Sequence, residues 1–339
     1  MSAELRQEVM RRTQGALFMN IAYIGVVNHL FVGLESLGQA SVGQLAGHSG
    51  MDEAYVNRWC DSAYAFELLD EVDTDRFALT ELGRLFLPDV PGSLMPFAVS
   101  AVLGAHMAER AAGLMPSGER PGEKVLAERQ TVLPWFGPML EGMFGPFLEN
   151  EIISNVPAYQ EVDARQGLAV DLGCGNGWYL RRLAQRLPNL RGVGLDGFDE
   201  NIKQANGLAE RDGTAGRIGF KTGDIHHFAI DEAADLIAMN RALHHVWDQK
   251  ENVFRIMKEH LKPEGVVIIW EPNWPKDRVL LREPGRRGMA FQNLSEHVQG
   301  NHFLQPEEIA AEFEKVGMQA EIFLFGEDRE AVVVGRNKG

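Results

Sequence analysis

The stretch that decides the fold is residues 170–177, which read Val-Asp-Leu-Gly-Cys-Gly-Asn-Gly. An apolar run ends here in an acid, and three glycines at alternate positions lead into a helical stretch that begins near Trp178. Glycines let a ligand approach the backbone closely and adopt dihedral angles that other residues avoid. The spacing is G-x-G-x-G, whereas the dinucleotide fingerprint is G-x-G-x-x-G, so the loop argues against a pyrophosphate ligand. We therefore expect a strand, a ligand-binding turn and a helix.

Short apolar runs alternate with helical stretches from about residue 167 onward. Such runs indicate buried strands, because the strands of a parallel sheet are covered by helices on both faces. The expected strands cover residues 168–172, 192–195, 218–222, 236–239, 266–270, 321–325 and 331–334. The last two are joined by the short turn 326–330, which predicts an antiparallel hairpin. The predicted class is α/β, with a mostly parallel seven-stranded sheet in residues 161–339.

The first third of the chain has a helical, winged-helix-like pattern, which we assign to residues 1–110. An apolar helix is expected over 17–34, and a capping box opens a short helix at Ser41. A further helix over 52–69 is followed by a small hairpin and a helix over 80–87. Two short helices, a turn and a hairpin form the pattern of a winged helix.

A DNA-binding role for this module conflicts with its charge. The chain has 48 acidic and 33 basic residues, a formal net charge of −15, and such a surface repels phosphate. The helix in the recognition position offers Arg58 against Asp52, Glu53 and Asp61, whereas base and phosphate contacts need arginine, lysine or amide side chains. We therefore expect no nucleic-acid partner and a role in dimerisation. A ligand-sensing regulator without catalysis is the alternative from another class.

Residues 111–160 are rich in Pro, Gly, Met and Phe and predict a helical connector that covers a pocket or forms a hydrophobic seam.

The apolar stretch 17–34 contains Asn20, Asn28 and His29, so it predicts a buried helix rather than a membrane span. The chain has two cysteines, too few for a disulfide framework, and its start lacks the apolar core of a secretory signal. We expect a cytoplasmic protein that binds no membrane.

Polar residues follow four of the expected strands, at the carboxyl ends where open α/β sheets bind ligands. They are Asp171, Asp196, Asp224 with Ile225, and Asn240 with Arg241. Asp196 lies 25 residues after Asp171. Its carboxylate has two acceptor oxygens, which match the two hydroxyls of a ribose.

The pattern D-x-G-x-G-x-G at residues 171–177 resembles motif I of class I S-adenosylmethionine-dependent methyltransferases. The resemblance implies a Rossmann-like, seven-stranded methyltransferase domain that binds S-adenosylmethionine as its cofactor. The cofactor-binding residues that it implies are Asp171, Gly173 and Gly175 in the loop, Asp196 at the ribose, Asp224 and Ile225 at the adenine, and Asn240 and Arg241 near the methionine end.

The layout of a winged-helix-like module followed by this domain is similar to that of dimeric small-molecule O-methyltransferases. Their His-x-Trp motif is matched by His245-Val246-Trp247. This resemblance implies a homodimer in which His245 is the general base that deprotonates a substrate hydroxyl, without a metal.

A second histidine, His244, precedes His245, and His297 follows 52 residues later. This arrangement resembles a smaller group, the α-keto acid C-methyltransferases, which methylate the β-carbon of phenylpyruvate-like or branched 2-oxo acids. The resemblance implies that His245 and His297 hold a metal, either iron or zinc, and that Arg129 contacts the substrate. His244, or a metal-bound hydroxide, is then the proton acceptor. The prediction is a C-methyltransferase for a small 2-oxo acid, with O-methylation by His245 as the alternative.

Overall fold

The computed structural model describes residues 3–122, 124–128 and 132–337. The chain divides into one unit of Met1–Glu109 with Leu126–Met143, and another of Arg110–Val125 with Phe144–Gly339. The predicted connector, 111–160, is thus shared between the two units.

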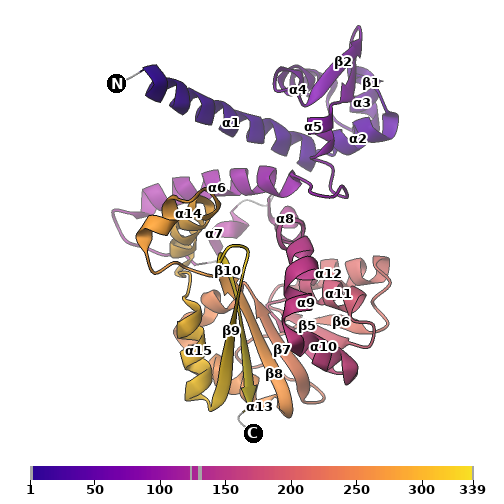
Figure 1. Cartoon of the computed structure of the whole chain (residues 1–339). Helices are drawn as coiled ribbons and strands as arrows, with labels where there is room; N and C mark the ends of the chain where they lie inside the picture. The colour runs from indigo at the N-terminus through magenta and orange to yellow at the C-terminus, as the bar shows by residue number, and fades with distance from the viewer. Residues whose placement is uncertain (1–2, 123, 129–131, 338–339) are drawn as a thin grey trace. The chain divides into compact units, whose positions relative to one another are not determined.

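The second unit is built on a seven-stranded sheet with the order β6-β5-β4-β7-β8-β10-β9 (Figure 1). Its strands are β4 (Leu168–Leu172), β5 (Arg191–Asp196), β6 (Ile218–Thr222), β7 (Ala234–Asn240), β8 (Leu261–Pro272), β9 (Met318–Phe325) and β10 (Glu330–Asn337). Strands β6, β5, β4, β7 and β8 run parallel, and β10 pairs antiparallel with both β8 and β9. The α/β class, the mostly parallel sheet and the final hairpin are therefore confirmed.

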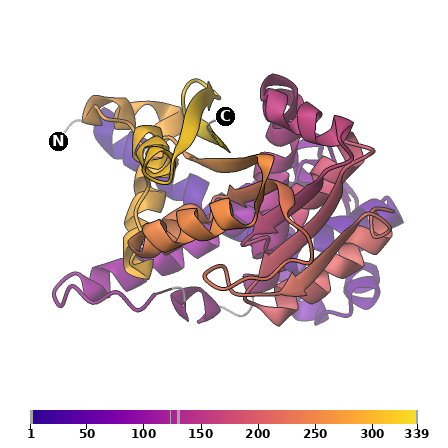
Figure 2. The same cartoon turned by 90° about the horizontal axis from the view of Figure 1, so that it is seen from below.

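Helices precede β4 in the chain or connect the strands that follow it. They are α10 (Pro157–Ala164), α11 (Trp178–Arg186), α12 (Asp199–Arg211), α13 (Lys250–Glu259), α14 (Pro284–Gln299) and α15 (Pro306–Lys315), with the short η1 (Leu148–Ile152), α9 (Ile153–Asn155), η2 (Leu243–Gln249) and η3 (Arg278–Arg282). Helices α11 and α12 contact β4–β6, whereas α13 and α15 contact β8–β10. The view from below in Figure 2 shows α13, in orange, crossing in front of the sheet.

The middle of the sheet is buried, since every residue of β4 is buried, including Asp171. In β5, a Cβ at Gly194 would lie 2.4 Å from the ring of Phe220, so glycine is needed for the close packing of β5 and β6. The carboxyl ends of the five parallel strands then meet at one edge of the sheet, where the predicted site residues follow them.

The first unit contains the predicted winged-helix elements. They are α1 (Ala3–Val27), α2 (Leu30–Leu37), β1 (Ala40–Ser41), α3 (Val42–Ser49), α4 (Glu53–Ala65), β2 (Leu69–Asp73), β3 (Arg76–Leu79) and α5 (Glu81–Arg84). The capping box at Ser41 is confirmed, and the three-stranded sheet has the order β1-β3-β2. The predicted helix 17–34 is in fact two helices, because His29 adopts a left-handed φ of 55° between them.

Three further helices lie between the winged-helix elements and η1: α6 (Met95–Leu114), α7 (Lys124–Ala127) and α8 (Leu133–Phe147). Among the described residues, no single helix has the length and apolar composition of a membrane span; only α1 and α2 together reach it, with a bend of 67° between them.

Candidate active site

The glycine-rich loop joins β4 to α11. Gly173, Gly175 and Gly177 have φ angles of 74°, 53° and 73°, in the left-handed region that favours glycine. The Gly173 amide donates to the carbonyl of Leu195 at the end of β5, over 2.8 Å. A Cβ on Gly177 would lie 2.4 Å from the ring of Phe220, whereas a Cβ on Gly175 would meet no atom within 4 Å. Gly177 therefore allows the ring of Phe220 to pack against the loop, and the space beside Gly175 is open to a ligand.

Asp196 is the last residue of β5 and is held against this loop. Its Oδ2 accepts a hydrogen bond from the Gly175 amide over 2.9 Å. Its Oδ1 accepts from the Phe198 amide and from Nδ2 of Asn201, each over 3.0 Å. The carboxylate is thus fixed beside the open space at Gly175, which is the place expected for a ribose contact.

The residues expected at the adenine follow β6. Asp224 is exposed, and its Oδ1 accepts a hydrogen bond from the His226 amide over 2.8 Å. The Cδ1 atom of Ile225 lies 3.7 Å from the position of a Cβ on Gly173. The fold therefore brings the apolar side chain of Ile225 to the glycine-rich loop, although 52 residues separate it from Gly173 in the chain.

Asp171 and Asn240 form a buried pair at the ends of β4 and β7. Nδ2 of Asn240 donates to Oδ1 of Asp171 over 3.1 Å, and Asp171 is 2% exposed. Burial raises the pKa of Asp171 to about 8, against the hydrogen bond from Asn240, which lowers it, and with a smaller upward contribution from the nearby Asp196. Oδ1 of Asn240 is buried without a hydrogen-bond partner. The pair can therefore accept hydrogen bonds from a ligand.

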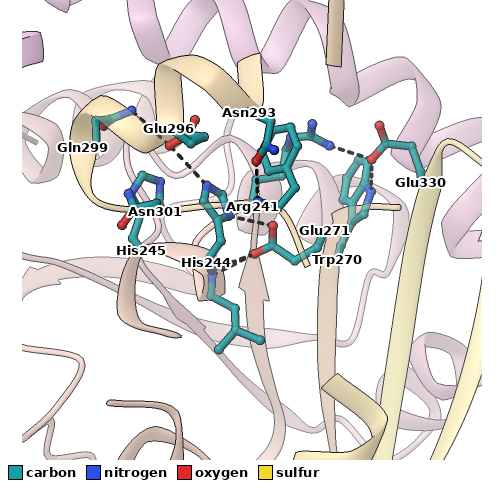
Figure 3. Close-up of polar contacts among 12 residues, drawn as sticks. Arg241, His244, His245, Trp270, Glu271, Asn293, Glu296, Gln299, Asn301 and Glu330 are labelled. Carbon is teal, nitrogen blue, oxygen red and sulfur yellow. Dashed lines mark hydrogen bonds and ion pairs between the residues drawn. The ribbon is translucent and has the colours of Figure 1, made fainter. Parts of the chain in front are cut away.

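The guanidinium of Arg241 already has two partners within the protein. Its Nη1 lies 2.5 Å from Oε2 of Glu330, and its guanidinium lies 3.9 Å above the centre of the Phe144 ring. Oε2 of Glu330 also accepts from Nε1 of Trp270 over 2.8 Å, and burial raises the pKa of Glu330. The predicted cofactor residue Arg241 therefore stands next to the site in an ion pair of its own (Figure 3).

His244 lies in η2, just beyond β7, and is 3% exposed. Its Nδ1 lies 2.7 Å from Oε2 of Glu271, and its Nε2 lies 3.7 Å from Oε2 of Glu296 without a hydrogen-bond partner (Figure 3). Burial lowers the pKa of His244, but the two carboxylates outweigh burial and raise it to about 10. Glu271 also accepts from the Leu243 amide over 2.8 Å, and Glu296 accepts from Nε2 of Gln299 over 3.0 Å.

His245 is half-buried, and its ring centre lies 4.2 Å from that of His244. Its Nδ1 lies 2.8 Å from Nδ2 of Asn301, which holds the ring in place. One ligand atom each from His244, His245 and Glu296 lie within 4.8 Å of one another. Two imidazoles and a carboxylate are a donor set that transition metals accept.

The metal pair expected from the sequence, His245 with His297, is not what the structure brings together. His297 is exposed on α14, while the preceding residue, Glu296, is buried and faces His244. Successive residues of a helix point about 100° apart, so only one of the two can face the cluster. Arg129, the expected substrate contact, lies outside the described residues.

Sequence reasoning missed Glu271, Glu296 and Asn301. Glu271 could have been predicted from the sequence, because it is an acid that directly follows the apolar run 266–270. Asp171 follows the apolar residues 168–170 in the same way. Glu296 and Asn301 could not have been predicted in this way, because they belong to a helix and a loop whose orientation depends on tertiary packing.

Residues 169–265 match the family model described as a methyltransferase domain. Together with the sheet order and the glycine-rich loop, this match shows that the chain carries a class I S-adenosylmethionine-dependent methyltransferase domain. Over 103 residues the chain is 33% identical to a trans-aconitate 2-methyltransferase of Deinococcus radiodurans, which covers 30% of this chain and 37% of that relative. The chain therefore matches well under half the length of this curated relative.

Solved structures match the whole chain at lower identity. An O-methyltransferase family protein from Burkholderia thailandensis is 17% identical, with a TM-score of 0.72 and coverage of 100% of this chain and 99% of that one. The N,N-8-amino-8-demethyl-D-riboflavin dimethyltransferase RosA from Streptomyces davawensis is 20% identical, with a TM-score of 0.71 and full coverage of both chains. These likenesses show that the chain shares the fold of these two proteins.

Proposed function

We propose that this protein transfers the methyl group of S-adenosylmethionine to the β-carbon of a small 2-oxo acid. The observation that carries the proposal is the cluster of His244, His245 and Glu296, in which His244 and Glu296 are buried and His245 is half-buried. Two of its members, His244 and His245, follow β7, whose last residue, Asn240, donates a hydrogen bond to Asp171 of the cofactor loop. The groups that can activate an acidic C–H bond therefore lie at the sheet edge that is proposed to bind the cofactor.

The resemblance to α-keto acid C-methyltransferases implies a metal on His245 and His297, and the residues that surround His245 in the structure fit a metal with Glu296 in place of His297. The buried Nε2 of His244 has no hydrogen-bond partner, and it faces a carboxylate oxygen 3.7 Å away. His244, His245 and Glu296 would hold the ion. A bound metal supplies Lewis-acid stabilisation of an enolate oxygen, an effect of several kcal/mol.

The chain's own residues bind and orient the cofactor in this proposal. Asp171 and the unpartnered Oδ1 of Asn240 accept hydrogen bonds from the ammonium group of the methionine part. Asp196 accepts from the ribose, and Ile225 packs on the adenine. The new C–C bond forms as the S–CH₃ bond breaks, which leaves S-adenosylhomocysteine and a proton as the other products. Alignment of the two reacting centres supplies much of the rate gain.

The second candidate is O-methylation of a phenolic or polyketide hydroxyl, with His245 as the general base and no metal. Its support is the half-buried position of His245, whose ring is held by Asn301. The similar structure from Burkholderia thailandensis is described as an O-methyltransferase family protein. A positioned imidazole contributes about a hundred- to ten-thousandfold to such a reaction.

The two candidates separate in one assay. The purified protein is incubated with S-adenosylmethionine and either phenylpyruvate, 4-methyl-2-oxovalerate or a set of phenols, and methylated products are identified by mass spectrometry. We expect products from the oxo acids that disappear after treatment with a chelator. Turnover of phenols alone, unaffected by the chelator, would replace the first candidate with the second.

A cytoplasmic homodimer is the proposed assembly, and α1 supports it. Val9, Met10 and Leu17 on this helix are 63%, 57% and 50% exposed, a large apolar surface for a single chain to leave in water. Light scattering on the wild type should give the mass of two chains, and the double variant Val9→Glu/Leu17→Glu should give that of one. A monomeric wild type would overturn this assignment.

A further inference from the structure

We propose that Tyr179, held by Tyr159, fixes the side-chain amide of Asn240 so that its oxygen accepts a hydrogen bond from the ammonium group of S-adenosylmethionine. The two tyrosines are then positioning residues, from helices α10 and α11, that act on the cofactor through Asn240. The inference rests on the proposed function only in placing Asn240 and Asp171 at the methionine part of the cofactor.

The first argument is a chain of contacts between buried polar groups. The hydroxyls of Tyr159 and Tyr179 lie 2.8 Å apart, and the two residues are 0% and 1% exposed. Burial raises the pKa of Tyr179, whereas a hydrogen bond from Asn240 to its hydroxyl lowers it. Nδ2 of Asn240 also donates to Oδ1 of Asp171 over 3.1 Å. The contacts therefore link both helices to the buried pair at the ends of β4 and β7.

The second argument is which end of the Asn240 amide the protein holds. Oδ1 of Asn240 is buried without a hydrogen-bond partner, so Nδ2 is the atom that serves both Tyr179 and Asp171. An amide nitrogen has two hydrogens, and these two neighbours take one each. The nitrogen end of the amide is thus fixed on two sides, and the oxygen end is left for a ligand.

The third argument is the direction of the hydrogen bonds. Burial raises the pKa of both tyrosines, so both hydroxyls keep their hydrogens. The bond between them also raises the pKa of Tyr179 and lowers that of Tyr159, as donation from Tyr179 to Tyr159 does. Both bonds then point the same way, from Asn240 to Tyr179 and from Tyr179 to Tyr159. Hydrogen bonds in such a chain strengthen one another.

The orientation of the amide matters because an ammonium group can only donate. An Asn240 side chain that turned over would present its NH₂ group to another donor and lose the bond. Tyr179 prevents this turn, because its hydroxyl oxygen takes a hydrogen of the amide nitrogen. Packing does not require the hydroxyls, since phenylalanine at both positions would fill the same space without polar groups to satisfy. Their effect should therefore fall on cofactor affinity.

Calorimetry on the full chain compares two ligands that share the adenosine and the thioether sulfur. S-adenosylhomocysteine carries the ammonium and carboxylate groups, and 5′-methylthioadenosine carries a methyl group in their place. Tyr179→Phe should weaken binding of S-adenosylhomocysteine about tenfold, as the loss of one hydrogen bond does, and should change that of 5′-methylthioadenosine less than about twofold. Tyr159→Phe should act in the same direction with a smaller loss of about threefold.

A double-mutant cycle separates positioning from general support of the fold. In the Asn240→Ala background, Tyr179→Phe should not weaken S-adenosylhomocysteine any more, because the amide that it holds is absent. The matched control is Tyr23→Phe, which removes a buried hydroxyl without a hydrogen-bond partner in the other unit and should leave both affinities unchanged. If Tyr179→Phe does not fold, the double variant Tyr159→Phe/Tyr179→Phe replaces it, since it leaves neither hydroxyl without its partner.

Equal losses for the two ligands in Tyr179→Phe would overturn the proposal, and so would a loss that persists in full in the Asn240→Ala background. Unchanged binding of S-adenosylhomocysteine by Tyr179→Phe would overturn this inference alone and leave the proposed function in place. The expected losses without methylation of oxo acids would support the positioning role and remove the proposed substrate. A wild type that binds neither ligand would overturn both.

Discussion

The Asp171→Asn substitution should stabilise the ligand-free protein even though Asp171 belongs to the proposed cofactor site. Burial raises the pKa of this carboxyl group from 3.8 to about 8, so the folded protein holds the proton more tightly than the unfolded chain does. Stability therefore falls as the pH rises between these two values. Each pH unit costs about 1.4 kcal/mol, so the loss at pH 7 is about 4 kcal/mol as an upper bound. Asparagine does not titrate and can still accept the hydrogen bond from Asn240.

The measurement is the free energy of unfolding in urea for the full-length wild type and variant at several pH values from 4 to 8. The two proteins should be nearly equal at pH 4, and the variant should become increasingly more stable toward pH 8. Asp224→Asn, which removes an exposed carboxyl group of the same domain, is the control and should follow the wild type. Parallel curves for wild type and Asp171→Asn would refute the reasoning. Affinity for S-adenosylmethionine should change in the opposite direction and fall in Asp171→Asn.

Three further substitutions test other parts of the domain. Gly177→Ala should cost about 2–4 kcal/mol of unfolding free energy, measured in urea, because its Cβ would lie 2.4 Å from the Phe220 ring at a left-handed φ; an unchanged midpoint would contradict this. Glu330→Gln should cost about 3 kcal/mol by the same measurement, because it leaves the Arg241 guanidinium buried without its counter-charge, and a loss below about 1 kcal/mol would mean that water replaces it. Asp196→Asn should weaken binding of S-adenosylmethionine about ten- to hundredfold in calorimetry, and unchanged affinity would remove Asp196 from the cofactor site.

The sheet could be predicted from the sequence because its strands carry local signals. The run 168–172 coincides with β4, and the close spacing of the last two runs correctly predicted an antiparallel pair. The position of β10 between β8 and β9 could not be predicted, since the order of strands depends on contacts between distant segments. The break between α1 and α2 was also missed. It occurs because His29 adopts a left-handed conformation, and the presence of a histidine does not predict that conformation.

The candidate site shows the same division between local and distant information. Asp171 and Asp196 could be predicted as candidates because an acid at the end of an apolar run is a local pattern, and Asp196 accepts a hydrogen bond from the Gly175 amide of the loop. That Glu296 and not His297 faces His244 could not be predicted, because it depends on how α14 is rotated about its own axis. That rotation is set by tertiary packing and not by the spacing of histidines.

The strand order has a consequence for the synthesis of this protein. β10 is made after every other strand of the sheet, yet it pairs between β8 and β9. A nascent chain that ends before residue 330 exposes β8 as a bare edge, which invites pairing with other chains. It also lacks Glu330, so Arg241 has no counter-ion. Resistance to proteases should therefore arise on the ribosome only after β10 has emerged from the exit tunnel.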